Sequence, residues 1–309
     1  MKIAFRIDAS SSIGTGHFVR MSALARAFEG LGCSCAFFRG EHEPIDYEPF
    51  DIVILDTYEI SSSYISQLKT ANRLLVCYDD NALYTYDCHV LLNANFHAHE
   101  LKFKFLGKKP LTLFGPQYAL LRDEFQNAKP IEVREAAKEI FVCFGGSDLR
   151  GFTPAAVNAL RDMPGISLNV VLGTHTSCDR EVGHMKSKNA RVHKNPANIS
   201  EIMASCDIAL TGAGSMVYEL ACLGIPSIVV AQADNQKLIA DYLERHMLMK
   251  YAGDWDRFQN IRQEAEKLLG DYARRKAESE RLAKAVNKQG AMAAAKAILG
   301  VAHEHLGRN

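Results

Sequence analysis

Three features are missing from this sequence, and each absence narrows the range of functions. There is no excess of charge, because Lys and Arg total 36, Asp and Glu total 36, and the formal net charge is +0. There is no run of about 18 apolar residues, so no membrane-spanning helix is expected. There is no long block of lysine and arginine, whereas a nucleic-acid-binding protein usually has a basic excess or a basic face. We therefore expect neither a membrane nor a nucleic acid as a partner.

Zinc-binding and secretion patterns are missing as well. The sequence has 8 cysteines, but no second Cys or His pair at the spacing of a zinc site accompanies the Cys-x-Cys of residues 33–35. Several cysteines lie inside apolar segments such as "LLVCYDD", which is typical of reduced, buried thiols in a cytoplasmic protein. Arg6 and Asp8 interrupt the apolar N-terminus, which therefore predicts a first strand rather than a signal peptide. We expect a cytoplasmic protein with no metal and no cofactor.

Short apolar segments alternate with helical patterns through the first half of the chain. The segments that predict strands lie at 2–8, 34–40, 51–57, 73–80 and 88–94. Met21, Leu24 and Phe28 repeat at helical spacing and predict a helix that ends at "GLGC". Strands that alternate with helices favour an α/β fold with a parallel sheet.

The same alternation restarts after a polar segment that contains Pro130 and predicts a linker. Strands are predicted at 139–146, 167–173, 207–212 and 226–231, and helices at 153–163, 198–206 and 215–224. Thr153 and Pro154 predict the start of one of these helices. We predict two Rossmann-like, doubly wound domains facing a cleft, residues 1–128 and residues 137–309, with a helical tail on the second domain.

Two glycine-rich loops follow predicted strands of the second half. Gly214 and Ser215 lie where a strand gives way to a helix, and backbone amides at such a start favour an anion such as phosphate, although many similar loops bind nothing. Gly145, Gly146 and Ser147 could meet a diphosphate or form a plain turn. Neither loop has the spacing of a dinucleotide fingerprint or a P-loop, which argues against an NAD enzyme and a Walker-type ATPase.

Polar residues at two further places have open interpretations. Glu219 lies among apolar residues of a predicted helix, where its carboxylate needs donors; these are either ribose hydroxyls or an arginine or lysine from elsewhere. Asn235 and Gln236 follow the last predicted strand, where they either bind sugar hydroxyls or cap the next helix.

The first half also carries polar side chains at predicted strand ends, where α/β sheets bind ligands. They are Tyr78, Asp79, Asp80, Asn93 and Asn95. His97 and His99 have a spacing that suits a metal on a strand, but no third ligand is evident.

The loop "SSSIGTGH" ends at His17, directly before the first predicted helix. From the residues alone, His17 caps the helix, binds phosphate or acts in catalysis. The positive end of the helix disfavours the imidazolium form, whereas a bound diphosphate would favour it, and the sequence leaves this balance open. Asp8, at the end of the preceding strand, is a candidate to orient the ring.

Taken together, these loops resemble the PseG-type nucleotide-sugar hydrolases of pseudaminic acid biosynthesis. The resemblance rests on "RIDASSSIGTGHFVRMSALA", "CYDD" followed by "CHVLLNAN", "FGPQYALLRDEF", "FGGSD" and the glycine loop with "YEL", in that order. It covers residues 6–220 and is less clear beyond Gly253. Because such hydrolases are related to MurG-type GT-B glycosyltransferases, the resemblance implies a GT-B-like fold.

The resemblance also implies an activity and a set of site residues. Water would attack the anomeric carbon of UDP-2,4-diacetamido-2,4,6-trideoxy-β-L-altropyranose with inversion, releasing UDP and a free sugar for pseudaminic acid synthesis and flagellin glycosylation. His17 would be the general base, a role that suits imidazole near neutral pH. The sugar would contact Gly14, Gly16, Tyr78, Asp79, Asn235 and Gln236. UDP would contact Gly145, Gly146, Ser147, Asn198, Ile199, Gly214, Ser215, Met216 and Glu219. The alternatives are a MurG-like glycosyltransferase with a UDP-sugar donor and a module that only binds nucleotide sugars.

Overall fold

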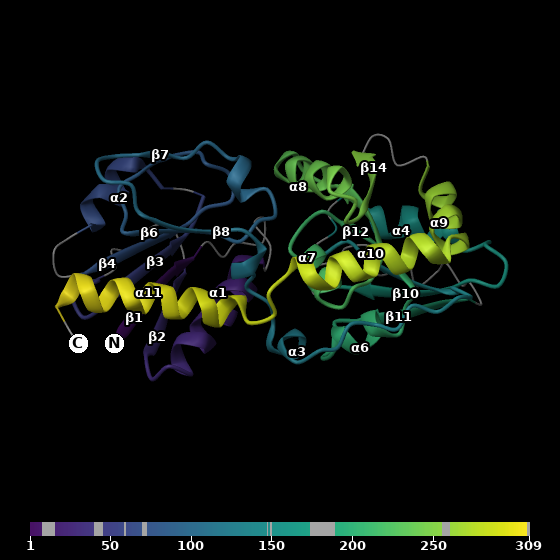
Figure 1. The fold of residues 1–309 in the computed structure, drawn as a ribbon, viewed down its shortest axis with the longest axis horizontal. Helices are drawn as coiled ribbons and strands as arrows, with labels where there is room; N and C mark the ends of the chain where they lie inside the picture. The colour runs from purple at the N-terminus through teal and green to yellow at the C-terminus, as the bar shows by residue number, and fades with distance from the viewer. Residues whose placement is uncertain are drawn as a thin grey trace. The chain divides into compact units, whose positions relative to one another are not determined.

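The computed structural model describes residues 1–7, 16–39, 46–58, 60–69, 73–146, 148, 150–173, 189–254 and 260–307. The chain forms two units, each with its own parallel sheet (Figure 1). Unit 1 comprises Met1–Asp123 together with Asn287–Asn309, and unit 2 comprises Glu124–Val286. Asp8, Gly14 and Ser147, which the sequence marked as candidate site residues, lie outside the described residues.

The sheet of unit 1 has six parallel strands. Their order is β2 (Ser34–Arg39), β1 (Lys2–Ile7), β3 (Ile52–Asp56), β4 (Leu74–Tyr78), β6 (Val90–Asn93) and β8 (Leu111–Phe114). The chain runs from β1 to β2 on one side and then crosses to β3 on the other side. The carboxyl ends of β1 and β3 therefore form the topological switch point, where open α/β sheets bind ligands. A separate two-stranded sheet joins β5 (Thr85–Tyr86) to β7 (Lys104–Phe105).

The first predicted helix and all five predicted strands of the first half are present in unit 1. Helix α1 (Gly16–Glu29) buries Met21, Leu24 and Phe28 against the sheet, each 0% exposed. It ends near Gly32, whose φ of +80° suits a residue without a side chain. The shorter helical segments of this part of the chain are α2 (Ser62–Leu68), η1 (Ala98–Glu100), η2 (Pro116–Tyr118) and α3 (Asp123–Gln126).

Unit 2 repeats the architecture with a second sheet of six parallel strands. The order is β11 (Ala190–Lys194), β10 (Ser167–Leu172), β9 (Glu139–Cys143), β12 (Ile208–Gly212), β13 (Ser227–Ala231) and β14 (Lys250–Asp254). This is the strand order of a dinucleotide-binding Rossmann sheet, with the switch point between β9 and β12. The helices in the described residues of this unit are α4 (Phe152–Leu160), α6 (Ile199–Ala204), α7 (Met216–Cys222), α8 (Asp234–Arg245), α9 (Ile261–Gly270) and α10 (Tyr272–Ala285).

The start of α4 differs from the prediction based on Thr153 and Pro154. The helix begins at Phe152, and Gly151 precedes it with a φ of +69°. The buried carboxylate of Asp148 accepts hydrogen bonds from the amides of Phe152 at 2.9 Å and Thr153 at 2.8 Å. Asp148, rather than Thr153, therefore supplies the acceptors for the first amides of α4.

The end of the chain also differs from the predicted domain boundaries. Residues 137–309 were assigned to the second domain, but helix α11 (Gly290–Leu306) belongs to unit 1 and runs along α1 (Figure 1). Its Ala291, Ala294 and Ile298 are buried in the core that includes Phe28 of α1. The small alanine side chains allow close helix packing, and this apolar stripe explains why the tail returns to the first sheet.

Candidate active site

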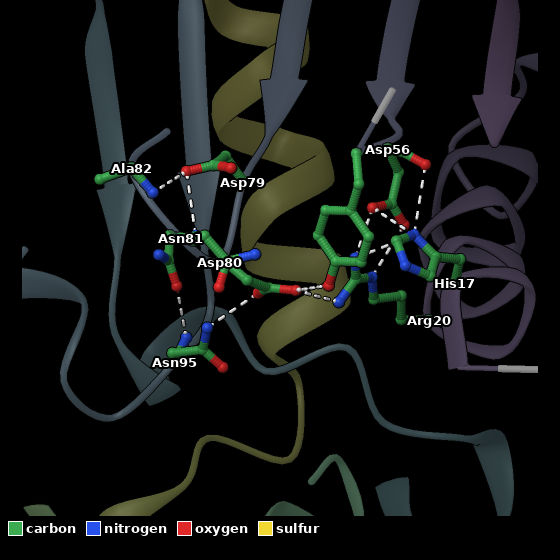
Figure 2. Close-up of polar contacts among 10 residues, drawn as sticks. His17, Arg20, Asp56, Asp79, Asp80, Asn81, Ala82 and Asn95 are labelled. Carbon is green, nitrogen blue, oxygen red and sulfur yellow. Dashed lines mark hydrogen bonds and ion pairs between the residues drawn. The ribbon is translucent and has the colours of Figure 1, made fainter. Parts of the chain in front are cut away.

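His17 lies at the switch point of unit 1. It is the second residue of α1, is 4% exposed, and its Nδ1 lies 2.8 Å from Oδ1 of Asp56 (Figure 2). Asp56 is the last residue of β3 and pairs in register with Ile7, the last residue of β1. The parallel pairing of β1 and β3 therefore brings the start of α1 and the carboxylate of Asp56 to the same edge of the sheet.

The contacts of the His17 ring favour one tautomer. Nδ1 faces two acceptors of Asp56, Oδ1 at 2.8 Å and the backbone oxygen at 3.2 Å, and one donor, Nη2 of Arg20, at 3.1 Å. The nearest contact is the carboxylate, so we place the proton on Nδ1. The hydrogen-bond contacts of this ring with the described part of the chain all involve Nδ1. Nε2 is then the unprotonated nitrogen, the form that a general base requires.

Arg20, one helical turn after His17, links two carboxylates. Its Nε donates to Oδ2 of Asp56 at 2.7 Å and its Nη2 donates to Oδ1, which makes a bidentate pair. Its Nη1 donates to Oδ2 of Asp80 at 2.6 Å, and the guanidinium lies 4.1 Å from the centre of the Tyr78 ring. Burial opposes the charge of Arg20, but Asp56 and Asp80 outweigh it and hold the pKa of Arg20 well above its ordinary value.

The carboxylate of Asp56 stays ionised although it is only 1% exposed. Burial alone would raise the pKa of Asp56. The charge of Arg20 and hydrogen bonds from Arg20 and His17 act in the opposite direction, so the pKa of Asp56 lies below its ordinary value. An ionised Asp56 can hold the His17 ring in position and can stabilise an imidazolium, as in a catalytic Asp–His pair.

Asp80 extends the network beyond the ion pair. Its Oδ1 accepts a hydrogen bond from Nδ2 of Asn95 at 2.8 Å, and its Oδ2 accepts one from the Tyr58 hydroxyl at 3.1 Å (Figure 2). The Tyr58 ring meets the His17 ring edge-on, with centroids 4.7 Å apart. We define the His17 cluster by the residues that these contacts join: His17, Arg20, Asp56, Tyr58, Asp80 and Asn95.

Asp79, the neighbour of Asp80, has a local role. Its Oδ2 accepts hydrogen bonds from the amides of Asn81, at 3.1 Å, and Ala82 (Figure 2). These bonds fix a turn in which Ala82 has a φ of +56°. Burial raises the pKa of Asp79 to about 6, although the Ala82 hydrogen bond works in the opposite direction. Asp79 therefore shapes the loop that presents Asp80.

Three other residues that the sequence marked in this half are Gly16, Tyr78 and His97. Gly16 is the first residue of α1, and Tyr78 packs against Arg20. His97 precedes the 3-10 segment η1 rather than lying on a strand. Within the described residues, no group of three or more His, Cys, Asp or Glu side chains is arranged to hold a metal ion.

The sequence analysis missed three members of the His17 cluster: Arg20, Asp56 and Tyr58. Signals for two of them were present. Asp56 ends a fully apolar strand, and Arg20 follows His17 by three residues, which places both on one face of a helix. No local pattern marked Tyr58.

The switch point of unit 2 is built from glycine backbone. Gly145 and Gly146 follow β9, and Gly145 has a φ of +90°. A Cβ on Gly173, at the end of β10, would lie 2.5 Å from the Cα of Gly146, so only glycine fits there. A Cβ on Gly212, at the end of β12, would overlap the side chain of Gln232. Close backbone packing of this kind lets amide groups approach a ligand.

Gln232 ties several strand ends of unit 2 together. Its side-chain Nε2 donates to the Phe144 oxygen at 3.2 Å, and its backbone N–H donates to Oε1 of Gln236 at 3.0 Å. Gln236 lies in the first turn of α8, and its Nε2 is 3.5 Å from the position that a Cβ on Gly214 would take. Asn235 lies in the same turn and is exposed.

The remaining predicted UDP-binding residues lie at helix starts. Ser215 directly precedes α7, Met216 is its first residue, and Glu219 lies in its first turn and is 8% exposed. The Asn198 side chain caps α6 by accepting from the amide of Glu201, and Ile199 is the first residue of that helix.

Solved structures define the class of fold. The chain matches the crystal structure of MurG from Acinetobacter baumannii with a TM-score of 0.66, over 97% of this chain and 100% of that chain, at 13% identity. The match confirms the predicted GT-B-like architecture of two Rossmann-like domains. No helix in the described ranges has both the length and the apolar composition needed to span a membrane.

Proteins related by sequence indicate a narrower similarity than the fold does. The chain is 27% identical over 273 residues to the UDP-2,4-diacetamido-2,4,6-trideoxy-β-L-altropyranose hydrolase of Campylobacter jejuni, covering 79% of this chain and 97% of the relative. It is 26% identical over 288 residues to an uncharacterised protein of Methanocaldococcus jannaschii, of which the match spans 59%. No family model matches the chain. The similarity to the hydrolases of pseudaminic acid biosynthesis that the motifs predicted is confirmed.

Proposed function

We propose that the chain hydrolyses UDP-2,4-diacetamido-2,4,6-trideoxy-β-L-altropyranose to UDP and the free sugar. The observation that carries this proposal is the contact between Nδ1 of His17 and the ionised Asp56, which leaves Nε2 as a proton acceptor. The similarity to the Campylobacter jejuni hydrolase supports the choice of substrate.

In the proposed reaction, a water oxygen attacks the anomeric carbon while Nε2 of His17 takes a proton from that water. The bond between the anomeric carbon and the diphosphate oxygen breaks, and UDP leaves with the bonding electron pair, so the anomeric configuration inverts. Asp56 stabilises the imidazolium that forms, and the proton later returns to solvent.

We propose that unit 2 binds the UDP portion. Backbone amides of Gly145, Gly146, Ser147, Gly214, Ser215 and Met216 would meet the diphosphate and stabilise it as a leaving group without a metal. Glu219 would accept hydrogen bonds from the ribose hydroxyls, and the backbone at Asn198 and Ile199 would meet uracil. Gly14, Gly16, Tyr78, Asp79, Asn235 and Gln236 remain candidates for the sugar.

A MurG-like glycosyltransferase is the second candidate, because the fold matches MurG over 97% of this chain. Such an enzyme would use the same UDP-sugar donor but would transfer the sugar to an acceptor other than water. We favour hydrolysis because the sequence relative with 97% coverage is a hydrolase. We also propose that the protein works in the cytoplasm, on a route that leads to pseudaminic acid and flagellin glycosylation.

Incubation of the purified chain with the UDP-sugar and no acceptor distinguishes the two candidates. If the chain is a hydrolase, UDP and free sugar will form in equal amounts. NMR measures both products over many turnovers. Intact UDP-sugar after prolonged incubation, with turnover only when an acceptor is added, would favour the transferase. UDP binding without any product would leave only a binding module.

A further inference from the structure

The His17 cluster holds more negative than positive charge. Asp56 and Asp80 each contribute a carboxylate, and Arg20 is the cation that contacts both. With His17 neutral, these groups carry one excess negative charge. A buried group of this kind is stable only if its charges are paired and hydrogen-bonded, and the contacts of Arg20, Tyr58 and Asn95 with the two carboxylates meet that condition.

The other described groups near His17 and Asp80 add no positive charge. Tyr58 and Tyr78 contribute neutral rings, and burial raises the pKa of Tyr58. Burial lowers the pKa of His97, which lies near Asp80, so His97 is neutral at neutral pH. Asp79 is adjacent in sequence but directs its carboxylate to its own turn. Among the described residues, Arg20 is therefore the cation that balances Asp56 and Asp80.

We propose that Asp80 is a positioning residue: by pairing with Arg20, it determines how strongly the cluster favours the imidazolium form of His17. This inference rests on the proposed function, in which His17 takes a proton from water. Because Arg20 is shared between Asp56 and Asp80, it does not neutralise Asp56 alone. The excess negative charge therefore stabilises the His17 imidazolium, and the cluster becomes neutral when His17 takes up the proton.

Each substitution in the network has a predicted direction. Asp80→Asn removes one negative charge. The positive charge of Arg20 is then no longer offset by Asp80 and repels the His17 imidazolium, so the titration midpoint of the His17 ring falls by about one pH unit. Arg20→Gln removes the positive charge, so the midpoint rises by about the same amount. General structural damage does not produce shifts of opposite sign, which makes the pair of variants more informative than either alone.

NMR titration of the histidine rings in the full-length protein measures these shifts without any turnover. The protein has 11 histidines, and the His17→Asn variant identifies the His17 signal by its disappearance. Asp87→Asn is the matched control, because Asp87 is paired with Lys69 and lies outside the His17 cluster. Circular dichroism and thermal unfolding report whether each variant is folded.

The proposal predicts a fall for Asp80→Asn, a rise for Arg20→Gln and no shift for Asp87→Asn. The acidic limb of kcat/KM for hydrolysis would move in the same directions. No shift, or shifts of the same sign in both cluster variants, would overturn it; if one variant does not fold, the sign of the other decides. If the wild type does not hydrolyse the UDP-sugar, the proposed function fails, while the NMR titration still tests the charge balance.

Discussion

The two units use the same kind of sheet but place different chemistry at its switch point. In unit 1, side chains from the start of α1 meet the end of β3, where Asp56 holds His17 and Arg20 by hydrogen bonds of 2.7–3.2 Å. In unit 2, the corresponding edge is glycine backbone, packed so closely that a Cβ on Gly173 would collide with Gly146.

This difference matches two chemical tasks. Proton transfer needs a side chain that changes its charge, and neighbours that hold it in one tautomer. Binding a diphosphate needs several backbone amides close to the ligand and no side chain in between. The fold provides the switch point in both units, and the residues placed there determine what each unit does.

The largest expected effect comes from removing the proton acceptor. His17→Asn should lower kcat about 10³-fold, within the range for loss of a general base. The affinity for UDP, measured by calorimetry, should stay the same because the nucleotide is assigned to unit 2. Normal turnover in the folded variant would remove His17 from the mechanism, and a large loss of UDP affinity would blur the distinction between the units.

The next effect lies in unit 2. Glu219→Ala should weaken UDP binding about 10–100-fold, the value of charged hydrogen bonds to a ligand, with a smaller effect on kcat at saturating substrate. Titration with 2′-deoxy-UDP sharpens the test, since the wild type should discriminate against it and the variant should not. Glu201→Ala changes an exposed glutamate of the same unit and is the control. Unchanged UDP affinity in Glu219→Ala would exclude the ribose contact.

A single methyl group tests the backbone surface of unit 2. Gly173→Ala should displace Gly145 and Gly146, weaken UDP binding about tenfold and lower the stability of unit 2 by about 1–3 kcal/mol. Gly270→Ala is the matched control, because a Cβ there meets no atom within 4 Å. Equal UDP affinities for the two variants would show that the Gly145–Gly146 backbone does not bind the diphosphate.

The smallest effect concerns Asp79, which we expect to act on stability through its loop. Its pKa in the folded protein is raised from 3.8 to about 6, so the folded state binds the proton more tightly than the unfolded state. Stability is therefore lost as pH rises from about 4 through 6, and Asp79→Asn should be more stable than the wild type by about 1–2 kcal/mol at pH 8 but not at pH 4.

Thermal unfolding at several pH values measures this difference. Asp46→Asn is the control, because exposed Asp46 accepts from the Glu48 amide at 2.9 Å in a similar turn. A stability gain for Asp79→Asn that does not depend on pH would contradict the assignment to the Asp79 carboxyl.

Much of the fold was predictable because its signals are local. The apolar strands of both units and the stripe of Met21, Leu24 and Phe28 follow from spacing alone. The position of α11 was not predictable in this way, because alanine-rich helices carry little information about which surface they cover. Its contact with α1 depends on a match between two helices far apart in the sequence.

The candidate site shows the same limit. His17 was found because it ends an unusual loop, but its partner Asp56 comes from another strand, 39 residues further along the chain. Only the parallel register of β1 and β3 brings the two together. The sharing of Arg20 between two carboxylates depends on helix α1 and on the ends of β3 and β4, and it has no local sequence pattern.

Hydrolysis in ¹⁸O-labelled water tests the central claim most directly. If His17 activates water for attack on the anomeric carbon, mass spectrometry will find the label in the free sugar and none in UDP. NMR of the first-formed product will show the inverted anomer, and His17→Asn will form this product about 10³-fold more slowly. Label in the β-phosphate of UDP would place the attack at phosphorus and contradict the account.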